Sequence, residues 1–166
     1  MKTNTIPMAL QKGFKTSPAA ENTRAIPGAV FNFLSTGAET EGRQALIRIV
    51  VNRGAEPPAH THSREDESYY VVKGSVRYTV GEDIITVNEG EYVYLPKDIP
   101  HQFEILTEQA EVLMWLSPAG LDQWFWDNSA PSPDGKPLPM PEGPPPPHVI
   151  EHFVTSLREY GVEMIG

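Results

Sequence analysis

Short runs in which apolar and polar residues alternate, separated by turn residues, occupy the middle of the chain. Residues 44–52 are the clearest run, because Ile47 and Ile49 can share one face while Arg48 lies on the other, as a half-buried strand requires. Runs of the same kind predict further strands at residues 30–34, 60–62, 68–72, 75–80, 84–87, 92–95, 102–106 and 111–116. So many short strands at close spacing, without alternating helices, predict an all-β barrel or sandwich.

Residues 1–26 lack this alternation. They mix polar residues with Pro7 and Pro18, and we expect an extended arm that leans on the body of the protein or on a second subunit. The predicted organisation is therefore an arm at residues 1–26, a barrel at residues 27–118, and a helical and proline-rich C-terminal extension at residues 119–166 that packs on the barrel.

The C-terminal extension changes character along its length. Residues 121–126 predict a short helix with Trp124 and Phe125 packed inward. Nine of the chain's 17 prolines lie in residues 131–147, which predicts a stiff, extended surface connector, with an SH3-type ligand as the alternative. Beyond it, apolar residues recur at helical spacing before Gly161, namely Val149 or Ile150, Phe153, Leu157 and Tyr160. Such an amphipathic helix implies that the tail docks back on the barrel.

Composition narrows the classes of function. The chain has 166 residues, of which 39% are hydrophobic and 21% charged, and this suggests one domain with room for a core. A formal net charge of -9 without a basic run argues against nucleic acid or an anionic membrane as a partner. The absence of cysteine excludes disulfides and thiolate metal sites. With no signal-peptide pattern and no apolar run long enough to span a bilayer, we expect a soluble, cytoplasmic protein.

Three histidines and a group of acids stand out as candidate metal ligands. His60 and His62 are one residue apart, so they share a face of their predicted strand. A third histidine, His101, follows a later strand and a proline turn. Imidazole nitrogens bind metals such as Zn, Fe, Ni and Cu, and a carboxylate fits beside them. Residues 65–67 are all acidic, and face parity does not single one out because a loop breaks the alternation.

The joint pattern of these residues resembles the cupin superfamily of small jelly-roll barrels. The two motifs of that superfamily read here G-x5-H-x-H-x4-E-x6-G and G-x5-P-x4-H, and they are filled by Gly54, His60, His62, Glu67, Gly74, Gly90, Pro96 and His101. The resemblance covers residues 44–118 and implies a jelly-roll barrel. It also selects Glu67 as the fourth ligand, which leaves Glu65 and Asp66 as expected solvated loop acids.

The second motif departs from the family pattern at two positions. The family usually has a glycine where this chain has Asp98, and often an asparagine where this chain has Ile105. Aspartate tolerates turn conformations, so we expect the turn at Asp98 to survive. Neither position is a metal ligand in the family.

Among cupins, the chain resembles the single-domain quercetin dioxygenase-like members, which cleave a flavonol ring with O₂. This resemblance implies one divalent metal ion held by His60, His62, Glu67 and His101, with Glu67 also acting as the base that takes the hydroxyl proton of the substrate. The sequence does not choose among Ni, Fe, Mn, Co, Cu and Zn. The alternatives are a metal-dependent isomerase and a non-catalytic cupin that binds a small ligand.

A substrate pocket is expected beside the metal. Tyr69 and Val71 are in register with Glu67, and Phe103 and Ile105 follow His101 in the same way, so all four should point into the barrel. Their aromatic and apolar character suits a flat or aromatic small molecule, with plain core packing as the alternative.

We also expect a homodimer. Small jelly-roll cupins commonly pair, and the polar arm has no core of its own to join. An arm that crosses to a partner would cover an edge strand, which otherwise invites aggregation.

Overall fold

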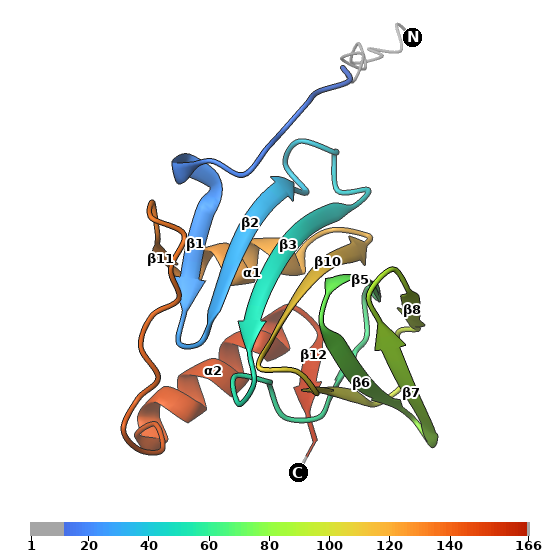
Figure 1. Cartoon of the computed structure of the whole chain (residues 1–166), viewed down its shortest axis with the longest axis vertical. Helices are drawn as coiled ribbons and strands as arrows, with labels where there is room; N and C mark the ends of the chain where they lie inside the picture. The colour runs from blue at the N-terminus through green and yellow to red at the C-terminus, as the bar shows by residue number, and fades with distance from the viewer. Residues whose placement is uncertain (1–11, 166) are drawn as a thin grey trace, which may run out of the picture.

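The computed structural model describes residues 12–165, which form two antiparallel β-sheets and two α-helices (Figure 1). The large sheet contains, in spatial order, β11 (Ala130–Pro131), β1 (Thr23–Ile26), β2 (Ala29–Ser35), β3 (Ala45–Asn52), β10 (Gln109–Ser117), β5 (Asp66–Lys73) and β8 (Tyr92–Leu95). The small sheet contains β12 (Val162–Met164), β4 (His60–His62), β9 (His101–Ile105), β6 (Ser75–Val80) and β7 (Asp83–Asn88). The helices are α1 (Leu121–Asp127) and α2 (Pro147–Glu159), and a 3-10 turn (Ala20–Asn22) precedes β1.

The all-β jelly-roll prediction is confirmed, and each predicted strand lies within about two residues of an observed one. Three short strands were not predicted, namely β1, β11 and β12. Residues 1–11 of the predicted arm lie outside the described residues, and its last four residues form β1, which pairs with β2. The division into arm, barrel and extension stays a prediction.

The hydrophobic core lies between the two sheets. β3 alternates strictly between buried and half-buried residues, with Ile47 on the buried face and Arg48 on the outer face. Arg48 binds Glu111 there at 2.7 Å. Leu95, Ile105, Met114 and Leu116 are at most 1% exposed. Because each such side chain contributes about 1.5–3 kcal/mol by leaving water, the strands supply most of the stability of the fold.

The two helices cover the inner face of the large sheet where β1, β2 and β3 extend past the small sheet (Figure 1). Phe125 of α1 packs on Phe31 of β2, with ring centroids 5.4 Å apart. Phe153 of α2 meets Trp124 of α1 edge-on at 5.0 Å. Helix α2 also contributes the buried side chain of Leu157 to the hydrophobic core. Neither helix is long and apolar enough to cross a membrane.

After α2 the chain turns at Gly161 and returns to the small sheet as β12. Gly161 has a φ of 81°, in the left-handed region that favours glycine, and a Cβ there would lie 2.5 Å from Ser63 Oγ. This close approach lets β12 pair with β4, the strand that carries His60 and His62.

Candidate metal centre

Three histidines from two strands of the small sheet and one glutamate from a strand of the large sheet converge inside the protein. His60 and His62 come from β4, Glu67 from β5 and His101 from β9, and His60 stands opposite His101 in the β4–β9 pair. One ligand atom from each of the four residues lies within 4.8 Å of the others. The structure thus brings together all four residues that the sequence singled out as ligands.

Hydrogen bonds on the outer side of each imidazole aim its other nitrogen at the centre. Nδ1 of His60 lies 2.8 Å from the carbonyl oxygen of Pro58, and Nδ1 of His101 lies 3.2 Å from that of Ile99. A carbonyl can only accept, so both Nδ1 atoms donate, and in the neutral form of each ring Nε2 carries the lone pair. Nε2 of His62 and Nε2 of His101 are buried without a hydrogen-bond partner. A buried nitrogen rarely lacks a hydrogen-bond partner. Two such nitrogens that face one carboxylate indicate a site for a metal ion.

Glu67 is the negative charge of the cluster. Its Oε2 lies 3.2 Å from Nε2 of His101 and 3.8 Å from Nε2 of His62. Burial alone would raise the pKa of Glu67, but His101 and the other two imidazoles lower this pKa to about 2. The side chain is therefore a carboxylate at neutral pH, the form that binds a cation.

The pKa values of His60 and His62 shift in opposite directions. Burial lowers the pKa of His60, which favours the neutral imidazole that metals bind. Burial would also lower the pKa of His62, but Glu65 and Glu67 raise it above its ordinary value. The phenol of Tyr69 has a raised pKa through burial and the nearby Glu67 carboxylate, so it stays protonated.

These residues fit a divalent metal ion. Ligand atoms about 2.1 Å from one ion are at most about 4.2 Å apart, so a spread of 4.8 Å requires only small side-chain shifts. Three imidazoles with one carboxylate suit Ni, Fe, Mn, Co, Cu and Zn.

Glu65 is not the solvated loop acid that was expected. Its side chain is 2% exposed, and Oε1 lies 2.5 Å from Nδ1 of His62. Its neighbour Asp66 is partly exposed at the start of β5 and accepts a hydrogen bond from the amide of Lys97. Sequence reasoning missed Glu65 because the turn between β4 and β5 breaks the strand alternation, so only the tertiary structure shows which acid points inward.

The turn before His101 forms as expected. Asp98 adopts a φ of 65°, a conformation that aspartate tolerates better than most residues. Its amide donates a hydrogen bond of 2.7 Å to the carbonyl oxygen of His62. This bond ties the loop that leads to His101 directly to β4.

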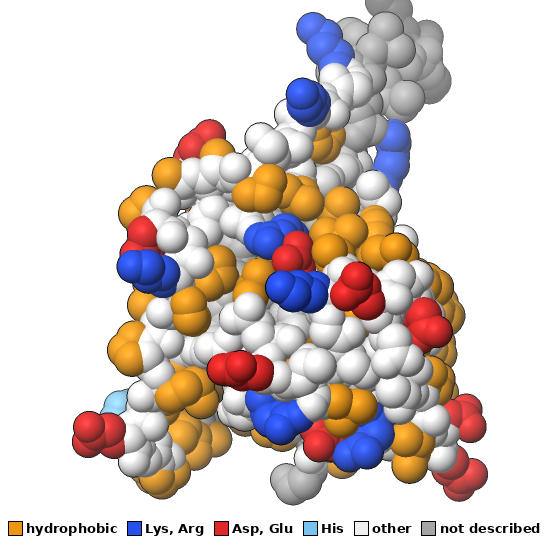
Figure 2. Space-filling model, viewed as in Figure 1, with side chains coloured by type: hydrophobic (Ala, Val, Ile, Leu, Met, Phe, Trp, Pro, Cys, Tyr) orange, Lys and Arg blue, Asp and Glu red, His pale blue; other side chains and the backbone are white. Residues whose placement is uncertain are grey.

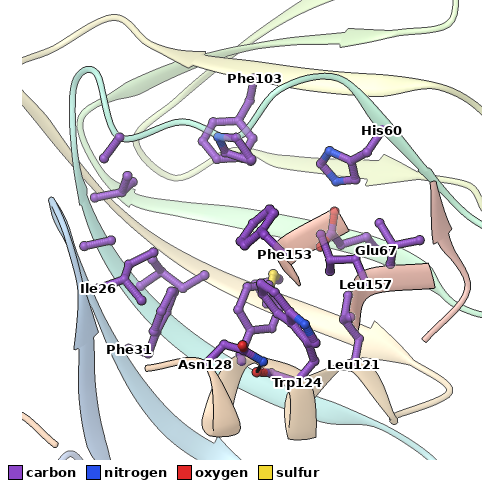
Figure 3. A pocket seen from close by; sticks show the side chains of 18 of the residues that line it. Ile26, Phe31, His60, Glu67, Phe103, Leu121, Trp124, Asn128, Phe153 and Leu157 are labelled. Atoms are coloured by element: carbon purple, nitrogen blue, oxygen red, sulfur yellow. Dashed lines mark hydrogen bonds between the residues drawn. The ribbon is translucent and has the colours of Figure 1, made fainter. Parts of the chain in front are cut away.

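A cavity of about 470 Å³ opens beside the metal-ligand cluster, and His60, His62 and Glu67 form part of its wall. Figure 3 shows His60 and Glu67 at one end, Ile26 and Phe31 at the other, and Phe153 projecting between them. Seven aromatic side chains line it, namely Phe31, Tyr69, Tyr78, Phe103, Trp124, Phe125 and Phe153. Among the described residues that line it there is no lysine or arginine.

Three of the four residues that were predicted to form the pocket line this cavity. Tyr69, Phe103 and Ile105 line the cavity, whereas Val71 is fully buried and lies outside its lining. The residues of α1 and α2 that line the cavity were not predicted to do so. The helical spacing of Phe153 and Leu157 was visible in the sequence, but not the surface on which the helix docks.

Comparisons with known proteins agree with the fold. The family model described as Cupin domain matches residues 47–117. An uncharacterised protein of Streptomyces coelicolor is 31% identical over 107 residues, which is 64% of this chain and 96% of that protein.

Two solved structures have a similar fold. An RmlC-like cupin from Shewanella frigidimarina matches with a TM-score of 0.56 at 22% identity, over 69% of this chain and 99% of that chain. Bacillus subtilis oxalate decarboxylase, a protein with Mn(II) centres, matches with a TM-score of 0.55 at 23% identity, over 76% of this chain and 35% of that chain. At these identities the similarity shows the fold alone.

Proposed function

The chain belongs to the cupin family, and we propose that it is a metal-dependent dioxygenase of the quercetinase-like type. Its substrate would be a flavonol or a related aromatic or enolic small molecule that is cleaved with O₂. The observation that carries this proposal is the position of Glu67 and two imidazoles in the wall of a largely apolar cavity that seven aromatic side chains help to line.

His60, His62, Glu67 and His101 would hold the ion, which when bound supplies Lewis acidity and a template for orientation. Glu67 is ionised and buried, and it reaches the cavity, so it can accept the proton of a substrate hydroxyl placed at that end. Loss of that proton makes an enolic ring more electron-rich and more open to attack by O₂. Burial and the same carboxylate raise the pKa of Tyr69, so its phenol stays protonated near Glu67.

The cavity favours an apolar body on the substrate. Phe103 lies on one side of the cavity, Trp124 on the other, and Phe153 between them (Figure 3). Aromatic faces pack well against a flat ring system. Beyond the reach of the proposed metal ion, a second carboxylate of a substrate would lack a cationic partner, because no lysine or arginine is among the described residues that line the cavity. The cavity therefore supports an aromatic substrate over a small dicarboxylate.

The direct test has two parts. Elemental analysis of the purified protein identifies the ion, with Mn included since the similar Bacillus subtilis protein has Mn(II) centres. Oxygen uptake is then measured with a panel of flavonols and catechols. We expect uptake in step with loss of substrate for the wild type and none for the His60→Ala, His62→Ala double variant.

Other results would select another function. Conversion of a compound without oxygen uptake would favour a metal-dependent isomerase. Tight binding without turnover would favour a cupin that only binds its ligand. A cytoplasmic location remains a prediction from the sequence.

A further inference from the structure

Glu65 is a buried carboxylate to which the proposed reaction gives no role. Both Glu65 and His62 are 2% exposed, and Oε1 of Glu65 lies 2.5 Å from Nδ1 of His62. Acidic side chains are almost never fully buried unless they are paired, because burial removes the hydration of the charge. The pair therefore forms on the side of His62 that faces away from the metal ligands.

His62 differs in this respect from the other two histidines. His60 and His101 each donate from Nδ1 to the backbone carbonyl two residues earlier in the chain. The residue two positions before His62 is His60, which lies in the same strand. The partner of His62 Nδ1 is the side chain of Glu65 and not a backbone carbonyl. Of the three histidines, His62 thus depends for its outer hydrogen bond on a side chain, which a mutation can remove.

The two acids that follow Glu65 in the chain do not take this place. Asp66 is partly exposed and accepts a hydrogen bond of 2.9 Å from the amide of Lys97. Glu67 approaches His62 from the opposite side, with Oε2 3.8 Å from Nε2. Glu65 is the acid on the Nδ1 side.

We infer that Glu65 is a positioning residue for the metal ion. Its carboxylate keeps the proton of His62 on Nδ1, fixes the plane of the ring and leaves the lone pair of Nε2 directed at Glu67 and His101. A carboxylate behind a ligating imidazole also makes that imidazole a stronger donor, and loss of such a partner typically lowers metal affinity by about 10–100-fold. The inference rests on the proposed metal centre and is independent of the reaction.

Three variants separate this role from a structural one. Glu65→Gln keeps an acceptor oxygen and removes the charge, whereas Glu65→Ala removes both. Asp66→Asn is the control, since it makes the same change of charge one residue away, at a partly exposed position. Affinity is measured by titrating the metal-free proteins with Co²⁺ against a competing chelator.

We expect affinity for Co²⁺ to fall about tenfold in Glu65→Gln and towards 100-fold in Glu65→Ala, and to stay within a fewfold of wild type in Asp66→Asn. The second readout is the ¹⁵N spectrum of the metal-free imidazoles, at a pH where they are neutral. It should show the proton of His62 on Nδ1 in the wild type and in Glu65→Gln. In Glu65→Ala it should show a mixture of tautomers, with His60 and His101 unchanged.

The outcomes are distinguishable. Unchanged affinity in both Glu65 variants, or an unchanged tautomer in Glu65→Ala, overturns the inference and leaves the metal centre intact. A lower melting temperature with unchanged affinity of the folded protein would make Glu65 a structural partner only, which also overturns it. If Glu65→Ala does not fold, affinity of the isosteric Glu65→Gln decides. Failure of the wild type to bind any divalent ion overturns the metal centre together with this inference.

Discussion

His62 and Val162 stand opposite each other in the antiparallel pair of β4 and β12. Two hydrogen bonds flank this pair, from the amide of Ser63 to the carbonyl of Gly161 at 2.9 Å and from the amide of Ile165 to the carbonyl of Ala59 at 2.8 Å. The last strand of the described chain therefore supports the strand that carries two of the four residues of the proposed metal centre. Helix α2, which covers the cavity, is joined to the metal centre through this strand.

Gly161 should be sensitive to substitution for this reason. Gly161→Ala places a methyl group against Ser63 and Arg64, whereas Gly42→Ala is a matched control, since Gly42 has a φ of 79° but nothing within 4 Å. We expect Gly42→Ala to cost about 1–2 kcal/mol through its backbone conformation alone, and Gly161→Ala to cost about 1–3 kcal/mol more through the clash. Urea unfolding measures both, and equal losses would show that the approach of the turn to β4 is unimportant.

Metal binding should require the four ligands together. His60→Ala, His62→Ala and His101→Ala should each lower metal affinity about tenfold or more, while the far-ultraviolet circular dichroism stays that of a β protein, because the strands supply most of the buried surface. His148→Ala, on the exposed face of α2, is the control and should bind as the wild type does. Equal metal occupancy in the wild type and in the His60→Ala, His62→Ala double variant would contradict the proposed centre.

Glu67 should matter for the rate beyond its part in holding the ion. Glu67→Gln keeps the size and one oxygen of the side chain, so the three histidines should retain some metal. Loss of a positioned base typically costs about 10²–10⁴-fold in rate. The quantity to measure is kcat per bound metal on the compound of the panel that is turned over. A Glu67→Gln protein within a fewfold of wild type would remove Glu67 as the base.

Phe153 should control how the cavity accepts its ligand. The side chain is 37% exposed, so Phe153→Ala should cost little stability, yet it removes the contact with Trp124 and opens the cavity beneath α2. We expect weaker binding of aromatic ligands, seen as a KM raised several-fold with kcat less affected. Ile150→Ala is the matched control, because Ile150 is 46% exposed on the same helix and does not line the cavity. Equal KM values in both variants would exclude this role.

The expected homodimer is open to a simple test. Outward-facing tyrosines of β5 and β8, at the edge of the large sheet, are 38–58% exposed, namely Tyr70, Tyr92 and Tyr94. The outer face of the large sheet carries hydrophobic side chains among charged ones (Figure 2). Sedimentation at micromolar concentration should give twice the chain mass of 18.4 kDa, and Tyr92→Lys should shift the equilibrium towards monomer. A wild-type monomer would contradict the prediction.

The sequence by itself predicted nine of the strands in the described chain and, with the family resemblance, the four residues of the proposed metal centre. Alternation in residues such as Ile47 and Arg48 depends only on the two-residue period of a strand, so it can be read without knowing the partner strands. His60 and His62 share a face for the same reason. The resemblance to the cupin motifs added Glu67 and His101. The first motif is complete in this chain, and the second keeps its histidine although it departs at Asp98 and Ile105.

The tertiary structure alone decided which acid supports the ligands and what closes the cavity. Glu65 lies in a turn, where no period relates sequence position to direction, and its burial beside His62 depends on the meeting of β4 and β5. The strand β12 is three residues long and forms only because α2 and Gly161 bring it to β4. Phe153 and Trp124 line the cavity because two helices dock where the large sheet extends past the small one. A periodic pattern shows which face of a helix is apolar, but it does not show the surface on which that face docks.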